Sequence, residues 1–121
     1  MPLKHYRELV AWQKAMDFAE LVYRLTRQFP REDMFGLTGQ LRRCAVSVAS
    51  NIAEGQGRGG PKEFLQFLNV SCGSLQEAET QIILAGRFGY ITEKEVTTTL
   101  ELAAEVGRIS NGLIRSLMRR S

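Results

Sequence analysis

Hydrophobic residues recur at the three-to-four-residue spacing of an α-helix over most of the chain, and no stretch alternates with the two-residue period of a β-strand. This pattern predicts helices over residues 6–28, 36–55, 61–87 and 93–119. The connections between them are short, which favours antiparallel neighbours. The sequence therefore predicts an all-α protein, an antiparallel up-down four-helix bundle in a single domain covering residues 1–121.

Residues at the ends of these segments support the boundaries. A Phe-Pro pair at residues 29–30 ends the first helix, because proline disfavours a helical conformation in the residue before it. Gly55 is expected to end the second helix as a left-handed cap, and Pro61 fits the first turn of the third. Gly89 is expected to close the third helix. Thr92 and Glu95 have the spacing of a capping box, which predicts the start of the fourth helix.

The first predicted helix carries more apolar surface than one packed side requires. Helical spacing joins the apolar residues Leu9, Trp12, Met16, Ala19 and Tyr23 into one stripe. A second set widens this face, namely Ala11, Ala15, Phe18, Val22 and Leu25. The polar wedge that is left for solvent is narrow.

The second predicted helix has two apolar sides. One side contains Leu37, Leu41, Cys44, Val48 and Ile52, and roughly opposite lie Val46, Ala49 and Ala53 with Arg42 among them. A helix with two apolar sides needs two partners, of which one is its own bundle and the other a further helix or a neighbouring subunit. The predicted core or oligomer anchors are Trp12, Tyr23, Val46, Ala49 and Ala53.

Composition places the 121-residue chain among ordinary globular proteins, with 44% hydrophobic and 24% charged residues. No apolar run is long enough to span a bilayer, so we expect a soluble, cytoplasmic protein with no membrane partner. Cys44 and Cys72 lie too far apart for a CxxC motif, and His5 cannot complete a zinc set with them. We expect two small buried cysteines in a reducing compartment and no metal or cofactor.

Five polar residues of the second and third helices are expected to form a structural network, with Arg42, Arg43, Asn51, Glu54 and Glu79 as its members. Arg42, set among apolar neighbours, is expected to pair with Glu79 or with a carboxylate of a neighbouring subunit. Arg43 shares a polar line with Ser47 and Glu54. Asn51 can satisfy backbone groups near the helix end, and Glu54 can bond Arg58 or a loop amide.

The same polar residues give little support to catalysis. Asn51 and Glu54 have no histidine near them in sequence to serve as a second titrating group. An alternative is an enzyme that uses Glu54 and Glu79 as metal ligands, but the chain lacks the Glu-x-x-His motifs of di-metal bundles. We therefore expect a protein that is not an enzyme, with no catalytic residues and no identified small-molecule substrate.

Basic residues provide the candidate contacts for an anion or a nucleic acid. Arg58 and Lys62 lie in the glycine-rich connection and at the start of the third helix, where the helix dipole favours an anion. The order of residues is not that of a nucleotide-binding P-loop, and glycines also suit a tight connection. The C-terminal end of the last helix adds Arg115, Arg119 and Arg120, which are either a solvated face or part of a shared basic surface. The net charge is only +3, so whether the chain binds nucleic acid depends on how its basic residues are distributed over the surface.

Several short stretches together resemble one known group, the bacterial four-helix-bundle proteins first described as encoded by intervening sequences within 23S ribosomal RNA genes. The matching stretches cover nearly the whole chain: VAWQKAM (10–16), FP (29–30), FGLT (35–38), QLRR (40–43), SNIAEG (50–55), KEF (62–64) and ETQ (79–81). The resemblance implies a bundle that assembles into a homopentameric ring. A related branch consists of accessory proteins of diversity-generating retroelements, in which a basic pentamer binds nucleic acid and a reverse transcriptase. The slight positive charge of this chain departs from that branch.

Pattern and resemblance together favour a homo-oligomeric scaffold or binding protein, expected to be a pentamer whose first two helices pack both within and between subunits. The alternative is an accessory protein that binds RNA or DNA, with a reverse transcriptase as a further partner, through Arg58, Lys62, Arg115, Arg119 and Arg120.

Overall fold

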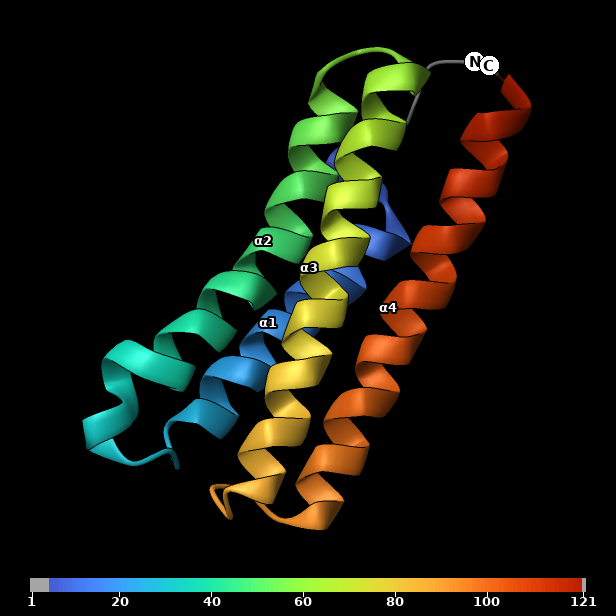
Figure 1. Cartoon of the computed structure of the whole chain (residues 1–121). Coiled ribbons are helices and arrows are strands. Elements are labelled where there is room, and N and C mark those ends of the chain that lie inside the picture. Colours follow the sequence, from blue (N-terminus) through green and yellow to red (C-terminus); the bar gives the residue numbers. More distant parts are fainter. Residues whose placement is uncertain (1–4, 121) are drawn as a thin grey trace.

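The computed structural model describes residues 5–120. Within this range the chain forms four α-helices and no strand, which confirms the predicted all-α class. The helices are α1 (Val10–Thr26), α2 (Gly39–Gly57), α3 (Pro61–Arg87) and α4 (Glu93–Arg120) (Figure 1). Short helical turns precede α1 and connect it to α2, namely η1 (Tyr6–Glu8), η2 (Arg31–Asp33) and η3 (Met34–Thr38).

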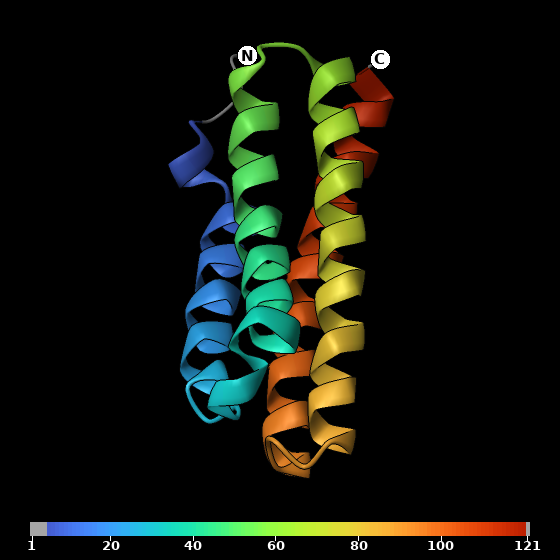
Figure 2. The same ribbon diagram turned by 60° about the vertical axis from the view of Figure 1, so that its left-hand side comes forward.

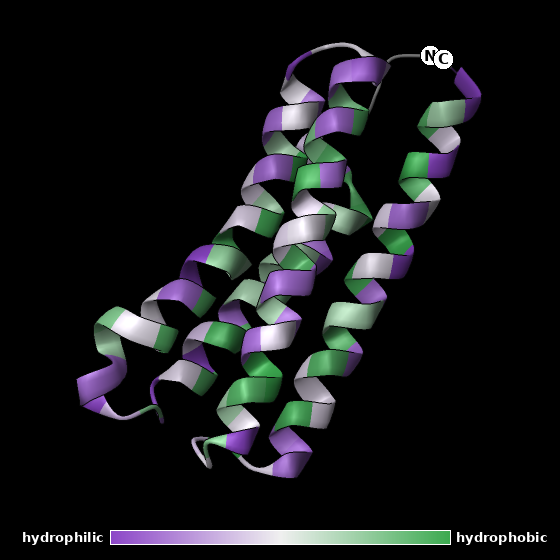
Figure 3. Ribbon diagram, in the orientation of Figure 1, coloured by the Kyte–Doolittle hydropathy of each residue, from purple (hydrophilic) through white to green (hydrophobic). Residues whose placement is uncertain are grey.

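Consecutive helices run in opposite directions along the bundle (Figures 1 and 2). α1 packs against α2 and α4, and α3 packs against the same two helices. The α2–α3 connection and the last turn of α4 lie at one end, while η2, η3 and the α3–α4 turn lie at the other. Hydrophobic and hydrophilic residues follow each other in bands along every helix, as amphipathic helices require (Figure 3).

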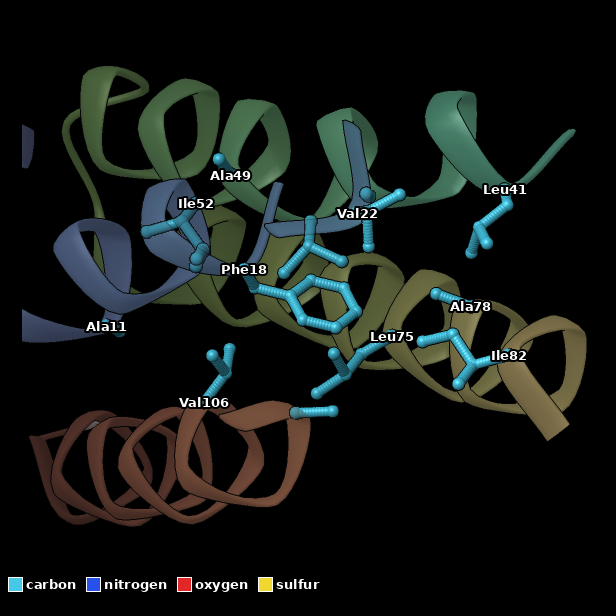
Figure 4. Packing of buried hydrophobic residues seen from close by; sticks show 14 of the residues in the cluster. Ala11, Phe18, Val22, Leu41, Ala49, Ile52, Leu75, Ala78, Ile82 and Val106 are labelled. Carbon is cyan, nitrogen blue, oxygen red and sulfur yellow. The ribbon is translucent and has the colours of Figure 1, made fainter. Parts of the chain in front are cut away.

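The core lies between the four helices (Figure 4). Each helix contributes fully or almost fully buried apolar side chains to it, among them Phe18 of α1, Ile52 of α2, Leu75 of α3 and Val106 of α4. Burying one such side chain stabilises a fold by about 1.5–3 kcal/mol. Packing of this core fixes the relative positions of the four helices, and with them the positions of the polar side chains.

The sequence of α1 contains two apolar stripes, and the one that faces the core is the set that includes Phe18. Ala11, Ala15, Phe18, Val22 and Leu25 are buried. In the other stripe Met16 and Tyr23 remain 39% and 41% exposed. The two stripes adjoin and both are apolar, so helical periodicity does not tell which of them faces the core. In the structure the stripe that contains Phe18 faces it, and the Phe18 ring is fully buried.

Two helix starts differ from the prediction. α1 begins at Val10 rather than at residue 6, because the extended Leu9 separates it from η1. α2 begins at Gly39 rather than at residue 36, because Gly36 in the preceding π-helical turn has non-helical angles (φ −102°, ψ −116°). In that turn the Asp33 carboxylate accepts a hydrogen bond from the backbone N–H of Leu37, 3.1 Å away.

The expected cap at Gly55 is wrong, because α2 continues to Gly57. Gly55 is buried, and a Cβ placed on it would lie 2.6 Å from the Cβ of Phe67. Its missing side chain therefore allows α2 and α3 to approach closely. The left-handed residue of this connection is Gly59, with φ +87°.

Three other boundary signals are confirmed. Pro61 occupies the first turn of α3, and Gly89, with φ +80°, follows the end of that helix. The Thr92 N–H donates to Glu95 Oε1 at 2.9 Å, and the Glu95 N–H donates to Thr92 Oγ1 at 3.1 Å. This capping box opens α4, which extends to Arg120.

Candidate functional site

Five predicted basic residues lie at one end of the bundle, which we call the basic end: Arg58, Lys62, Arg115, Arg119 and Arg120. Arg58 directly follows α2, and Lys62 is the second residue of α3. The three remaining arginines lie in the last two turns of α4, whose C-terminus reaches the same end as the α2–α3 connection (Figure 1). All five are exposed. Folding thus brings together cations that are about 60 residues apart in the chain.

Arg58 already has a partner within the basic end. Its Nη2 lies 2.7 Å from Glu54 Oε2, and its guanidinium lies 5.0 Å from the centre of the Phe67 ring. The hydrogen bond to Glu54 and the charge of that carboxylate raise the pKa of Arg58 above its ordinary value. The predicted bond between these two residues is confirmed, and it compensates one of the five charges.

A small polar network joins α2 to α3 where several of the predicted polar residues lie. Ser47 Oγ and Ser74 Oγ are 2.9 Å apart, and Asn51 Nδ2 donates to the Ser47 carbonyl oxygen and hydroxyl at 2.8 and 2.9 Å. Asn51 therefore bonds one turn back along α2, not to the helix end as expected. Arg43 is exposed and, within residues 5–120, makes no hydrogen bond or ion pair with Ser47 or Glu54. The network links α2 to α3 through side-chain hydrogen bonds.

Arg42 contacts α1 and not Glu79, so the expected pairing with Glu79 is wrong. Its pairing with a carboxylate of a neighbouring subunit stays a prediction. Its Nε donates to Thr26 Oγ1 at 2.8 Å, and its guanidinium lies 4.7 Å from the centre of the Tyr23 ring. The Thr26 hydroxyl in turn donates to the backbone of α1. Arg42 lies on the side of α2 that faces α1 and points away from α3.

Glu79 lies half-buried in a pocket of about 140 Å³ between α3 and α4, beside Cys72 and Gly107. Burial raises the pKa of its carboxyl group. Within the described residues it forms no ion pair. Cys44 and Cys72 are free and half-buried rather than fully buried, and burial raises the pKa of both thiols. Both thiols are therefore protonated at neutral pH and are poor nucleophiles.

The five predicted anchors differ in how far they are buried. Ala49 is buried and belongs to the core. Trp12 and Ala53 are half-buried, while Tyr23 and Val46 are 41% and 44% exposed. Sequence reasoning missed Phe35, which is 97% exposed in the turn before α2. Phe35 directly precedes the predicted start of a helix, and nothing in the local sequence indicates that its side chain is exposed to solvent.

Sequence reasoning also missed a second cavity, which we call the corner pocket. It has a volume of about 270 Å³ and lies where the end of α1 meets η2, η3 and the first turn of α2. Its lining includes three arginines, Arg27, Arg31 and Arg42, together with Thr38. Their spacing along the chain follows no periodic pattern, so only the turn geometry brings them together.

Within residues 5–120 the structure contains neither a metal-binding cluster nor a helix suited to span a membrane. No cluster of three or more His, Cys, Asp or Glu side chains is arranged to hold a metal ion in this part of the chain. No helix there has the length and apolar character needed to cross a membrane.

Comparison with known proteins places this geometry in a family. Residues 7–112 match the family of 23S rRNA-intervening sequence proteins. The fold is similar to the crystal structure of a protein of unknown function from the S23 ribosomal protein family of Bacteroides thetaiotaomicron, with a TM-score of 0.80 and 23% identity. The similar region covers 87% of this chain and 98% of that protein. No curated protein matches the sequence of this chain.

Proposed function

Because this chain belongs to the 23S rRNA-intervening sequence protein family, we propose that it is a non-enzymatic, homo-oligomeric scaffold or binding protein that assembles as a pentameric ring. The observation that carries the proposal is an apolar surface that the bundle leaves uncovered on α1 and α2. The ring itself is what the sequence resemblance implies. The two free thiols, Cys44 and Cys72, agree with a location in the reducing cytoplasm.

We call this uncovered region the outer α1–α2 surface and define it by Met16, Tyr23, Val46 and Ala53. Met16 lies seven residues before Tyr23, and Val46 seven residues before Ala53, so each pair shares one side of its helix. Arg42 joins the two sides, because its guanidinium lies over the Tyr23 ring and Val46 follows it by one helical turn. Contiguous exposed apolar surface of this kind marks interaction sites in soluble proteins.

A ring closes through head-to-tail contacts, in which one surface of each copy meets a different surface of the next. A charge placed at the centre of the outer α1–α2 surface would be buried without a partner in such a contact, which weakens association strongly. The substitution Val46→Glu introduces this charge. Val10, 51% exposed near the start of α1, offers a matched control on another side of the helix.

Analytical ultracentrifugation of the full chain and of both variants tests the proposal. We expect the unchanged protein and Val10→Glu to sediment as one oligomer, and Val46→Glu to sediment as a monomer or a weaker assembly with the same helix content. The proposal is wrong if Val46→Glu assembles as fully as Val10→Glu does.

A second candidate function is nucleic-acid binding, which the clustering of basic residues at one end favours. Four of these cations, those other than Arg58, have no ion pair within residues 5–120. A ring would repeat them around its axis and raise the local positive charge. The accessory proteins of retroelements, a branch related to the family that this chain resembles, would add a reverse transcriptase as partner.

Gel-shift titrations with RNA and with DNA at several salt concentrations test this second candidate. Affinity should fall steeply with salt, by a log-log slope of about −0.9 for each phosphate neutralised on duplex DNA. Replacing Lys62 and Arg119 by Gln should weaken binding and flatten the slope, whereas Arg24→Gln, at the opposite end, should not. Absence of binding at low salt would exclude this function while leaving the assembly proposal intact.

A further inference from the structure

The corner pocket is built from a buried floor and an exposed rim. Thr26, Phe29 and Thr38 line it and are 3%, 7% and 2% exposed. Arg27 and Arg31 also line it and are exposed. Its volume of about 270 Å³ exceeds that of an engineered protein cavity of about 150 Å³ that takes up benzene. The pocket therefore has room for a small ligand that reaches from solvent to the floor.

All charged side chains that line the corner pocket are positive. Arg27, Arg31 and Arg42 line the pocket, and no carboxylate does. None of the three arginines forms an ion pair within the described residues. Two acids follow Arg31 in the turn, and neither lines the pocket. Glu32 is exposed, and Asp33 accepts from the Leu37 N–H and hydrogen-bonds the Tyr90 side chain.

Arg42 is held in place before any ligand arrives. The bond from its Nε to Thr26 and the stacking on Tyr23 fix the plane of the guanidinium. No hydrogen bond of its terminal amino groups is found within residues 5–120. A planar guanidinium fixed in this way can present two parallel N–H donors to the oxygens of an anion at little further entropic cost.

Thr38 gives an independent sign that a ligand is missing. Its Oγ1 is buried and has no hydrogen-bond partner within the described residues. Buried hydroxyls nearly always find a partner, because an unmade hydrogen bond in the interior is costly. Because Thr38 lines the pocket and its Oγ1 is closed to solvent, the hydroxyl can donate to a ligand oxygen there after a rotation about its Cα–Cβ bond.

From these observations we infer that the corner pocket binds a phosphate group, either free or as the monoester of a small organic molecule. A phosphate carries up to two negative charges against the three cations and offers enough oxygens for several guanidinium donors and a hydroxyl. Phe29 and Met34, which also line the pocket, provide apolar contact for the organic part of a monoester. The pocket is lined by residues of the α1–α2 connection and the helix ends beside it, at the end of the bundle opposite the basic end (Figure 1). This site is therefore distinct from the proposed nucleic-acid surface.

Calorimetric titration of the full chain with inorganic phosphate and, separately, with phenyl phosphate at constant ionic strength tests the inference. We expect saturable binding of one phosphate per chain. Tighter binding of phenyl phosphate would assign the pocket to a monoester, and equal binding would assign it to free phosphate. The absence of saturable binding of either probe at millimolar concentrations would overturn the inference.

Substitutions locate the binding. Arg31→Gln should weaken phosphate binding about tenfold or more, since it removes a charged donor, and Arg31 is exposed, so the fold should be unaffected. Thr38→Val, which keeps the shape but removes the hydroxyl, should weaken it about three- to tenfold. Arg24→Gln removes an exposed arginine of α1 that does not line the pocket, and should change nothing.

Two results would contradict the assignment to this pocket. One is unchanged affinity in both Arg31→Gln and Thr38→Val. The other is an equal loss in Arg24→Gln and Arg31→Gln, which would indicate attraction by net charge alone. Circular dichroism melting curves of each variant separate a lost site from a lost fold.

Discussion

The inner and outer faces of α1 and α2 are both apolar, yet the bundle treats them differently. Phe18 and Ile52 on the inner faces are fully buried, whereas Tyr23 and Val46 on the outer faces keep more than two fifths of their surface exposed. The inner face is needed to close a four-helix core. The outer face keeps exposed apolar surface that the core does not use, which is why we propose a contact with another copy of the chain there.

The largest expected effect comes from breaking the inner face. Phe18→Ala should lower the free energy of unfolding by about 3–5 kcal/mol, because it removes a fully buried ring and leaves a cavity. Met16→Ala, on the outer face of the same helix, should change the stability of a dissociated monomer by less than about 0.5 kcal/mol. Urea titration under dissociating conditions measures both, and similar losses would mean that the two faces are not distinct.

A smaller effect is expected where α2 meets α3. Gly55→Ala should cost about 1–3 kcal/mol, since the new Cβ would be 2.6 Å from the Cβ of Phe67 and the helices would have to separate. Gly57→Ala, in the same helix with nothing within 4 Å of its Cβ, should be neutral or stabilising by up to about 1 kcal/mol. Thermal melting of the pair is the measurement. Equal effects would show that the close approach at Gly55 is unimportant.

Arg42 of α2 contacts the outer face of α1, and the neighbouring Arg43 offers a comparison. Arg42→Ala should cost about 1–2 kcal/mol, because it removes the bond to Thr26 and the contact with the Tyr23 ring. Arg43→Ala, which removes an exposed arginine, should stay within about 0.5 kcal/mol. Chemical denaturation would contradict this account if it ranked the two variants in the opposite order.

The smallest effect concerns Glu79 and depends on pH. Its pKa is raised in the folded chain, so the native state binds its proton more tightly than the unfolded state does, and stability falls as pH rises through the folded pKa. Glu79→Gln should therefore raise the melting temperature slightly at pH 7 and not at pH values below about 4, where the carboxyl is protonated in both states.

A control for this prediction is Glu77→Gln, which removes an exposed carboxylate of the same helix and should not reproduce that pH dependence. If Glu79→Gln instead destabilises the protein at pH 7, the carboxylate has a cationic partner, such as an arginine of a neighbouring subunit.

Local signals in the sequence were sufficient for much of the fold. Pro61, Gly89 and the Thr92–Glu95 box are short-range features, and the structure confirms each at its expected place. The buried positions of α3 follow one continuous helical stripe from Phe64 to Ala85, a pattern that periodicity alone can locate.

Other features depend on packing that local pattern does not encode. Periodicity shows that α1 has two apolar stripes but not which one meets the core. The π-helical turn at Gly36 and the position of Arg42 over Tyr23 depend on how α2 enters the bundle. The corner pocket is the extreme case, since its arginines at positions 27, 31 and 42 become neighbours only through that turn.

The mass of the protein in solution decides whether another copy of the chain covers the outer α1–α2 surface, as we propose. Light scattering of the full chain at micromolar concentration, coupled to size-exclusion chromatography, measures this mass. We expect a single species of about five times the 13.6 kDa chain mass. A species with the mass of one chain would show that the surface stays uncovered and the proposal is wrong.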